Sequence, residues 1–195
     1  MLNIAWLICC IPIVTIGAST TAFYYTVTKV VRNERGYLWP EFWRSFKSNF
    51  KQSTIVWLIM LIICIFAYFD IFYAYILTSS GMLPKILLWF ILILFVFVGM
   101  WMGYLFPYIA RFENTTGQIL KNSAIIMVRN ILWSIQNFII FAATVVLILM
   151  IPILLIILPV GCMVLTSMSL ERVFRKYMTA EDKEMEDKRN GNYYE

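Results

Sequence analysis

The feature that most constrains this chain is residues 131–170, a stretch without a single charged side chain. A helix crosses a bilayer with roughly 20 mostly apolar residues, so this stretch is about twice the length of one span. Residues 2–28, 54–77 and 85–110 are also apolar and long enough for one span each. Because 62% of the 195 residues are hydrophobic and 14% are charged, a soluble domain of this size could not bury the apolar surface. The sequence therefore predicts an all-α membrane protein.

Basic residues decide whether residues 131–170 form one span or two. Three polar segments carry an excess of positive charge, which marks the cytoplasmic side of a membrane protein. Their basic residues are Lys29, Arg32, Arg35, Arg44, Lys47, Lys51, Arg111, Lys121, Arg129, Arg172, Arg175 and Lys176. Two of these segments flank residues 131–170, so the chain must cross the membrane an even number of times between them. A tight helical hairpin is predicted, with its turn at Pro152, which suits a first helical turn, or nearer Pro159 and Gly161.

The predicted architecture is one helical membrane domain, residues 1–178, followed by a charged cytoplasmic tail, residues 179–195. Its five transmembrane helices are expected at about 2–28, 54–77, 85–110, 131–150 and 152–171. The N-terminus is expected outside and the C-terminus in the cytoplasm. In an alternative with four spans, one very long and tilted last helix would place the tail outside, against the positive charges of Arg172, Arg175 and Lys176.

A further helix is predicted at residues 39–52, between the first two spans. Its aromatic residues recur with the period of one helical stripe, and basic residues flank them. One interpretation is an amphipathic, interfacial helix on the cytoplasmic side, with its rings at headgroup depth and its cations against anionic lipid. The other is a docking helix for a protein partner, in which Trp43, Arg44 and Phe46 contribute most of the binding energy. The candidate docking residues are Trp39, Trp43, Arg44, Phe46, Lys47, Asn49 and Phe50.

Few polar groups lie inside the predicted spans. Asp70 is the only charged one, and it is interpreted either as hydrated or paired with Lys85, or as a substrate or proton site. Gly99 and Gly103 form a G-x-x-x-G pattern, which favours close packing of two helices. Small and hydroxylated residues between Pro12 and Tyr24 favour close packing in the same way.

The sequence predicts that the chain is not an enzyme. It has no histidine, so a histidine base is excluded, and no Gly-rich phosphate-binding loop. Its four cysteines have no metal-ligand spacing. No cofactor, metal ion or nucleic acid is expected, since the basic residues lie next to hydrophobic spans, as in cytoplasmic loops of membrane proteins.

Two segments resemble a known family. LNIAWLICCIPIVTIGASTTAFYYTVTKVVRNERGY (Leu2–Tyr37) and FWRSFKSNFKQST (Phe42–Thr54) are similar to the YesL family, Gram-positive membrane proteins of unknown function. ERVFRKYM (Glu171–Met178) resembles the closing R-x-F of that family, whose members usually carry more residues before the first span. No ligand-binding residues are established for the family.

The resemblance implies a compact helical membrane subunit. It also implies an association with transport, because genes of this family often lie beside those of oligosaccharide ABC importers. We therefore expect an accessory subunit in the cell membrane that assembles, stabilises or regulates a carbohydrate importer. Its expected partners are membrane lipids and the permease subunits. The alternatives are a small stand-alone transporter or channel and a transient membrane assembly factor.

Overall fold

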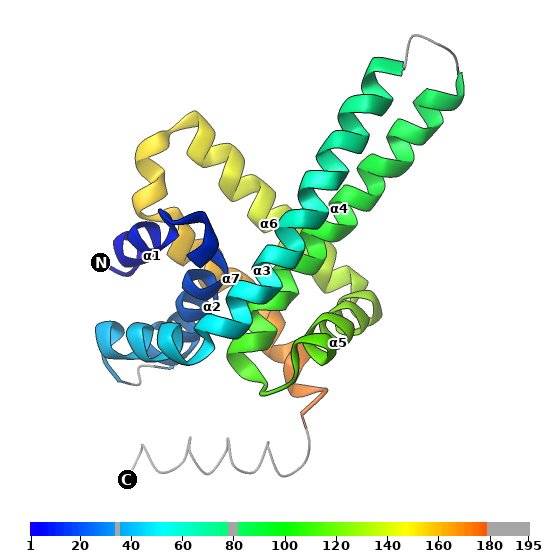
Figure 1. The fold of residues 1–195 in the computed structure, drawn as a ribbon. Helices are drawn as coiled ribbons and strands as arrows, with labels where there is room; N and C mark the ends of the chain where they lie inside the picture. Colours follow the sequence, from blue (N-terminus) through cyan, green and yellow to red (C-terminus); the bar gives the residue numbers. More distant parts are fainter. Residues whose placement is uncertain (34–35, 78–81, 179–195) are drawn as a thin grey trace.

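A computed structural model describes residues 1–33, 36–77 and 82–178 of the chain. The predicted all-α class is confirmed, because these residues form helices and no strand (Figure 1). The long helices are α1 (Leu2–Cys10), α2 (Ile16–Thr26), α3 (Leu38–Ile76), α4 (Met82–Arg111), α5 (Thr116–Arg129), α6 (Ile131–Met150) and α7 (Leu158–Arg175). The short ones are η1 (Ile13–Thr15), η2 (Val27–Arg32, a π-helix) and η4 (Pro152–Ile156).

Three helices in the described part of the chain are long and apolar enough to cross a membrane, not the five that were predicted. They are Leu38–Ile76, Lys85–Arg111 and Ile131–Met150. They contain the predicted spans 54–77, 85–110 and 131–150 almost entirely. The two other predictions, at 2–28 and 152–171, were wrong for different physical reasons.

The predicted span 2–28 is interrupted at Pro12, where the backbone is extended and no N–H is available to continue a helix. Helix α1 has 9 residues, about 14 Å at 1.5 Å per residue, and α2 has 11 and continues directly into the π-helix η2. Neither is among the helices of the described residues that are long and apolar enough to cross a membrane. They instead pack against each other, with the Ser19 hydroxyl donating to the Trp6 carbonyl over 3.1 Å.

The predicted span 152–171 is replaced by η4 and α7. The expected turn is present, because the chain leaves α6 at Met150 and α7 returns beside it, and this excludes one very long last helix. The Ser169 hydroxyl of α7 donates to Asn137 Oδ1 of α6 over 2.5 Å. However, α7 has only 18 residues, and its last turns contain Glu171 and two arginines, so its composition is not that of a spanning helix.

The predicted helix 39–52 and the following span are one continuous helix, α3, of 39 residues. No Gly or Pro between Glu41 and Leu77 interrupts it. The first part of α3, residues 38–52, runs across the lower edge of the molecule, and the helix then rises beside α4 (Figure 1). The Asn49 amide and the Ser48 hydroxyl both donate to the Ser45 carbonyl over 3.1 Å, and such side-chain bonds favour a bend in a helix.

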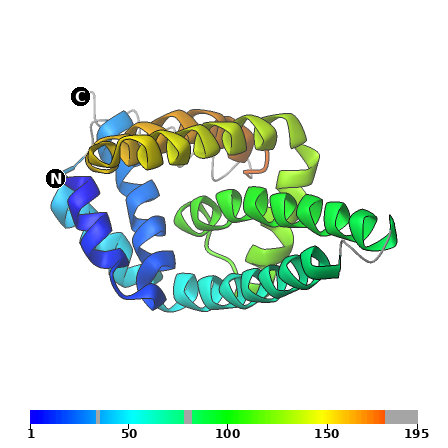
Figure 2. The same cartoon turned by 90° about the horizontal axis from the view of Figure 1, so that it is seen from above.

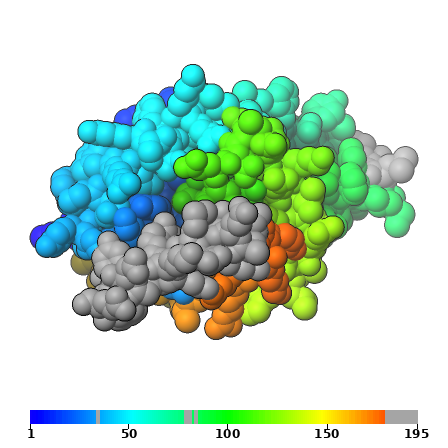
Figure 3. All heavy atoms as spheres, turned by 90° about the horizontal axis from the view of Figure 1, so that it is seen from below, coloured from blue at the N-terminus to red at the C-terminus, as the bar shows by residue number. Residues whose placement is uncertain are grey.

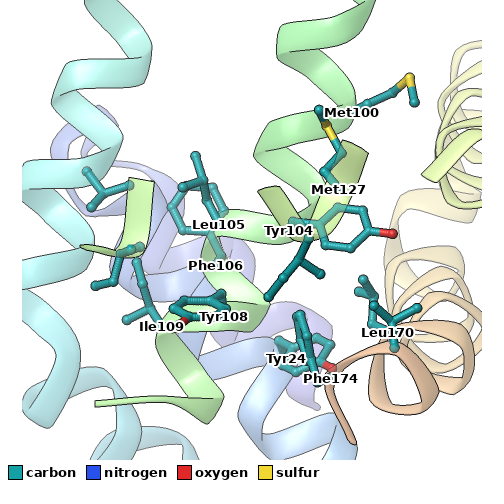
Figure 4. Packing of buried hydrophobic residues seen from close by; sticks show 14 of the residues in the cluster. Tyr24, Met100, Tyr104, Leu105, Phe106, Tyr108, Ile109, Met127, Leu170 and Phe174 are labelled. Carbon is teal, nitrogen blue, oxygen red and sulfur yellow. The ribbon is translucent and has the colours of Figure 1, made fainter. Parts of the chain in front are cut away.

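Seen from above, α3 lies on one side, α6 and α7 lie on the other, α4 runs between them, and α1 with α2 closes one end (Figure 2). The main core lies in the lower half, where α2, α4 and α7 meet (Figure 4). There the rings of Tyr104, Tyr108 and Phe112 each contact Phe174 edge-on. The upper parts of α3 and α4 form a projecting hairpin with many exposed apolar side chains.

Candidate functional site

The positive charge of the molecule gathers at one end, which we call the basic end. Every described Lys and Arg except Lys85 lies on η2, on the first part of α3, at the end of α4, on α5, or at the end of α7 and directly after it. Figure 3 looks onto this end, with the first part of α3, the start of α5 and the end of α7 around it. The basic end is therefore where the described chain concentrates its polar chemistry.

A buried polar cluster ties three helices together at the basic end. The Tyr24 hydroxyl of α2 donates to Glu171 Oε1 of α7 over 2.8 Å, and Arg111 Nη2 of α4 lies 3.5 Å from Glu171 Oε2. Tyr24 is 1% exposed, and the Glu171 and Arg111 side chains are about one-fifth exposed. Burial raises the pKa of the Tyr24 phenol well above 10.0, and the Glu171 carboxylate raises it further. Tyr24 therefore keeps its proton and remains the donor.

Two more cations of the basic end are bonded within the chain. Arg32 Nη1 donates to the Ser167 carbonyl over 3.2 Å and to its hydroxyl over 3.3 Å, which joins η2 to α7. Lys29 Nζ lies 2.8 Å from Glu41 Oε2, which joins η2 to the first part of α3. These bonds hold helices in place. Within residues 1–33, 36–77 and 82–178, no group of three or more Cys, Asp or Glu is placed to hold a metal ion.

Sequence reasoning missed the contact between Tyr24 and Glu171. The two residues are 147 positions apart, so no local spacing connects them. One signal was present: both lie in segments that carry the family resemblance, the Tyr24–Tyr25 pair and the segment that begins at Glu171.

The predicted docking residues lie on the first part of α3, but they do not share one surface. Consecutive rings are in contact, with centroids 5.9 Å apart for Trp39 and Trp43, and 5.5 Å apart for Trp43 and Phe46 and for Phe46 and Phe50. Trp43 and Phe46 are half-buried against the apolar cluster around Phe42. Trp39 is 58% and Phe50 39% exposed, and Arg44 and Lys47 are exposed too. Asn49 bonds its own helix, as described above. The two aromatic residues expected to contribute most to docking thus also belong to the fold.

Asp70 lies far from the basic end. Gln52 donates to the Asn114 carbonyl over 2.5 Å, which places Gln52 level with the chain just after α4. Asp70 is 18 positions further along α3, or about 27 Å at 1.5 Å per residue. Its side chain is exposed, and no ion pair joins it to Lys85 among the described residues. A shallow apolar groove of about 330 Å³ lies on the same hairpin, lined by Tyr68, Ile71, Phe72, Tyr75, Leu88 and Leu92.

The two glycines of the predicted packing motif have different surroundings. A Cβ on Gly99 would lie 3.3 Å from Phe138 of α6, whereas a Cβ on Gly103 would meet nothing within 4 Å. A much tighter contact involves Gly17 of α2, where a Cβ would lie 2.6 Å from the Ser53 carbonyl oxygen and 2.6 Å from Trp57 Cβ of α3. The small residues after Pro12 were the signal for this contact.

Comparison with known proteins relates part of the chain to a family. Residues 1–71 match the family model described as "Protein of unknown function, DUF624". The matched segment contains α1, α2 and α3 up to Ile71. No curated protein and no solved structure matches the chain.

Proposed function

We propose that the protein is an accessory subunit that assembles, stabilises or regulates a carbohydrate ABC importer by packing against its permease helices. The observation that carries the proposal is that few residues of the spanning helices are buried within the chain. In the most apolar stretch of each helix, 11% of the residues are buried in α3 and 6% in α4 and in α6. Helices in a bilayer associate through close packing, so these free faces are available to the helices of another subunit. The link to a carbohydrate importer rests on the YesL-like resemblance of Leu2–Tyr37 and Phe42–Thr54.

A stand-alone transporter or channel is the weaker candidate. Such a protein needs polar groups that converge on a pathway near the middle of the membrane. Asp70 is exposed on the hairpin, and Asn137 of α6 is hydrogen-bonded to Ser169. Since these groups lie on separate helices and do not meet, they give little support for such a pathway. A transient assembly factor would differ from an accessory subunit in leaving the importer after assembly.

We assign the basic end to the cytoplasm, because an excess of Lys and Arg marks that side. The end of α7 belongs to the basic end, which would place the C-terminus inside the cell. The amide of Asn3 donates to the carbonyls of Ile156 and Ile157, at the turn between α6 and α7. This turn is remote from the basic end (Figure 1), in keeping with an N-terminus on the outer side.

The projecting hairpin of α3 and α4 is the proposed contact for the permease. Phe72 and Leu88 line its shallow groove from the two helices, and such a groove suits an apolar side chain of a partner helix. The hypothesis of a docking helix at residues 39–52 stays a prediction. Its clearest test uses Trp39 and Phe50, which are exposed, rather than Trp43 and Phe46, which also pack within the chain.

Co-purification tests the proposal. The tagged chain is extracted in mild detergent from cells that express the importer, and the co-eluting proteins are identified by mass spectrometry. We expect permease subunits in a fixed ratio to the chain, and a marked loss of them with Phe72→Ala combined with Leu88→Ala. Leu132→Ala with Leu149→Ala on α6, whose side chains are 79% and 76% exposed, is the matched control. Trp39→Ala with Phe50→Ala tests the docking helix. Absence of permeases from the parent sample, at normal abundance of both proteins, would contradict the proposal.

A further inference from the structure

Three neighbouring cations on the first part of α3 have no bonding partner within the described residues. Arg44, Lys47 and Lys51 follow one another at spacings of three and four on α3, so they lie on one face of the helix. All three side chains are exposed, and no hydrogen bond or ion pair involves them in residues 1–33, 36–77 and 82–178. Lys29 and Arg32, by contrast, are bonded inside the chain. The face formed by Arg44, Lys47 and Lys51, which we call the cationic face, is available for an anionic ligand.

The position of this face relative to the spans indicates the source of the ligand. The bond between Gln52 and Asn114 places the end of the first part of α3 level with the point where the chain leaves α4, a spanning helix. Figure 1 shows this part of α3 running across the basic end instead of along the spans. A helix that crosses the end of a transmembrane bundle at this level lies where lipid headgroups lie.

The exposed rings beside the cationic face favour lipid over a soluble anion. Trp39 and Phe50 are exposed at the two ends of this helical segment, and they continue the row of rings through the half-buried Trp43 and Phe46. Aromatic rings of this kind settle at the level of the headgroups and acyl boundary. Free phosphate would use the cations alone, whereas a phospholipid would use the cations and the rings together.

We propose that Arg44, Lys47 and Lys51 bind the phosphate groups of anionic glycerophospholipids in the leaflet at the basic end. The guanidinium and ammonium groups donate to phosphate oxygens, while Trp39 and Phe50 rest against the acyl boundary of the same leaflet. The inference does not depend on the importer, because it concerns the chain in a bilayer by itself. In this proposal the cationic face binds lipid, whereas the hairpin of α3 and α4 binds the permease.

The experiment uses the purified full chain in a neutral detergent, titrated with phosphatidylglycerol. Thermal unfolding is followed by intrinsic Trp fluorescence, and bound lipid is counted by native mass spectrometry. We expect phosphatidylglycerol to raise the unfolding temperature of the parent, and phosphatidylcholine not to do so. The triple variant Arg44→Gln/Lys47→Gln/Lys51→Gln should bind phosphatidylglycerol about tenfold or more weakly, because several cations act on the same headgroups.

Two variants and one additional ligand make the outcome decisive. Lys121→Gln/Arg129→Gln/Arg172→Gln changes the net charge equally at exposed positions of α5 and α7 and should keep the parent response. Arg44→Lys/Lys47→Arg/Lys51→Arg keeps the positive charge of the cationic face and should also respond to phosphatidylglycerol as the parent does. Equal binding by the parent and the Arg44/Lys47/Lys51 Gln variant would overturn the proposal, as would an equal loss in the α5 and α7 control. An equal response to inorganic phosphate would assign the site to the free anion. If the Arg44/Lys47/Lys51 Gln variant bound lipid as the parent does but lost the permease subunits in co-purification, the cationic face would be assigned to protein docking.

Discussion

Replacing Gly17 by Ala is expected to destabilise the protein strongly, although it adds only one methyl group. The new Cβ would lie 2.6 Å from the Ser53 carbonyl oxygen and 2.6 Å from Trp57 Cβ, with a ring carbon of Phe106 at 3.1 Å. The first two atoms are fixed by the backbone of α3 and cannot rotate away. To reach an ordinary contact of 3.4 Å, α2 and α3 must separate by about 0.8 Å, the difference between 3.4 and 2.6 Å.

The free-energy cost follows from what this separation breaks. The hydroxyls of Thr21 and Ser53 are 3.0 Å apart, and Trp57 Nε1 donates to the Ile13 carbonyl over 2.7 Å. Both bonds join the N-terminal helices to α3, and both lengthen if α2 moves. Overpacking of a tight contact costs about 1–3 kcal/mol. Since each hydrogen bond contributes about 1 kcal/mol, we expect a cost at the upper end of that range.

The same substitution at Gly103 is the matched control. A Cβ there would meet nothing within 4 Å, and Ala favours a helix over Gly by about 0.5–1 kcal/mol. Gly103→Ala should therefore unfold at the parent temperature or slightly above it, whereas Gly17→Ala should unfold well below it. Thermal unfolding in mild detergent, followed by Trp fluorescence, measures both. Equal unfolding temperatures for the two variants would refute the argument that the contact of α2 with α3 is tightly packed.

Three other predictions concern the polar residues and the topology. Tyr24→Phe removes the hydroxyl that donates to Glu171 Oε1 and should lower the free energy of unfolding by about 1–3 kcal/mol. Because the pKa of folded Tyr24 lies well above 10, its contribution is complete below pH 10 and declines above it, so urea unfolding of parent and variant should converge at alkaline pH. Asp70→Asn should leave abundance and sugar uptake unchanged, since the carboxylate is exposed and has no ion-pair partner among the described residues; lost uptake at normal abundance would favour a transporter. A reporter fused to the C-terminus should be cytoplasmic, and one inserted at Ser80, outside the described residues, should be external; an external C-terminal reporter would reverse the assignment of the basic end.

Apolar length predicted the spans where a polar segment or a proline ends the helix near the predicted boundary. The prediction 85–110 lies within α4, which ends at Arg111, and 131–150 coincides with α6, which ends just before Pro152. The stretch 2–28 is equally apolar, yet Pro12 divides it into two helices that pack on each other. Hydropathy measures the transfer of side chains into lipid, so it does not show that Pro12 lacks the backbone N–H that would continue the helix. The continuity of α3 through Ser53 was missed for the opposite reason: a change from polar to apolar composition suggested two helices where no residue breaks the helix.

The candidate site was less predictable because its contacts join distant segments. The periodicity of residues 39–52 identified a row of rings, and the rings are indeed in contact. It could not show that Trp43 and Phe46 would pack on the N-terminal helices, since that depends on where α1 and α2 fold. Nothing in the spacing of Tyr24, Arg111 and Glu171 indicates that they meet. Such pairs follow from tertiary packing, which periodicity along one helix does not encode.

The bond from Asn3 to the turn after α6 has a consequence for the order of folding. Asn3 reaches the carbonyls of Ile156 and Ile157, and the apolar cluster around α1 includes Val160, Met163 and Val164 of α7. Helix α1 therefore cannot complete its packing until the chain about 150 positions later has been synthesised, and contacts of such long sequence separation slow folding. Residues 1–71 expressed alone would lack the three α7 side chains of this cluster, so the packing of α1 would stay incomplete in the segment that matches the family model.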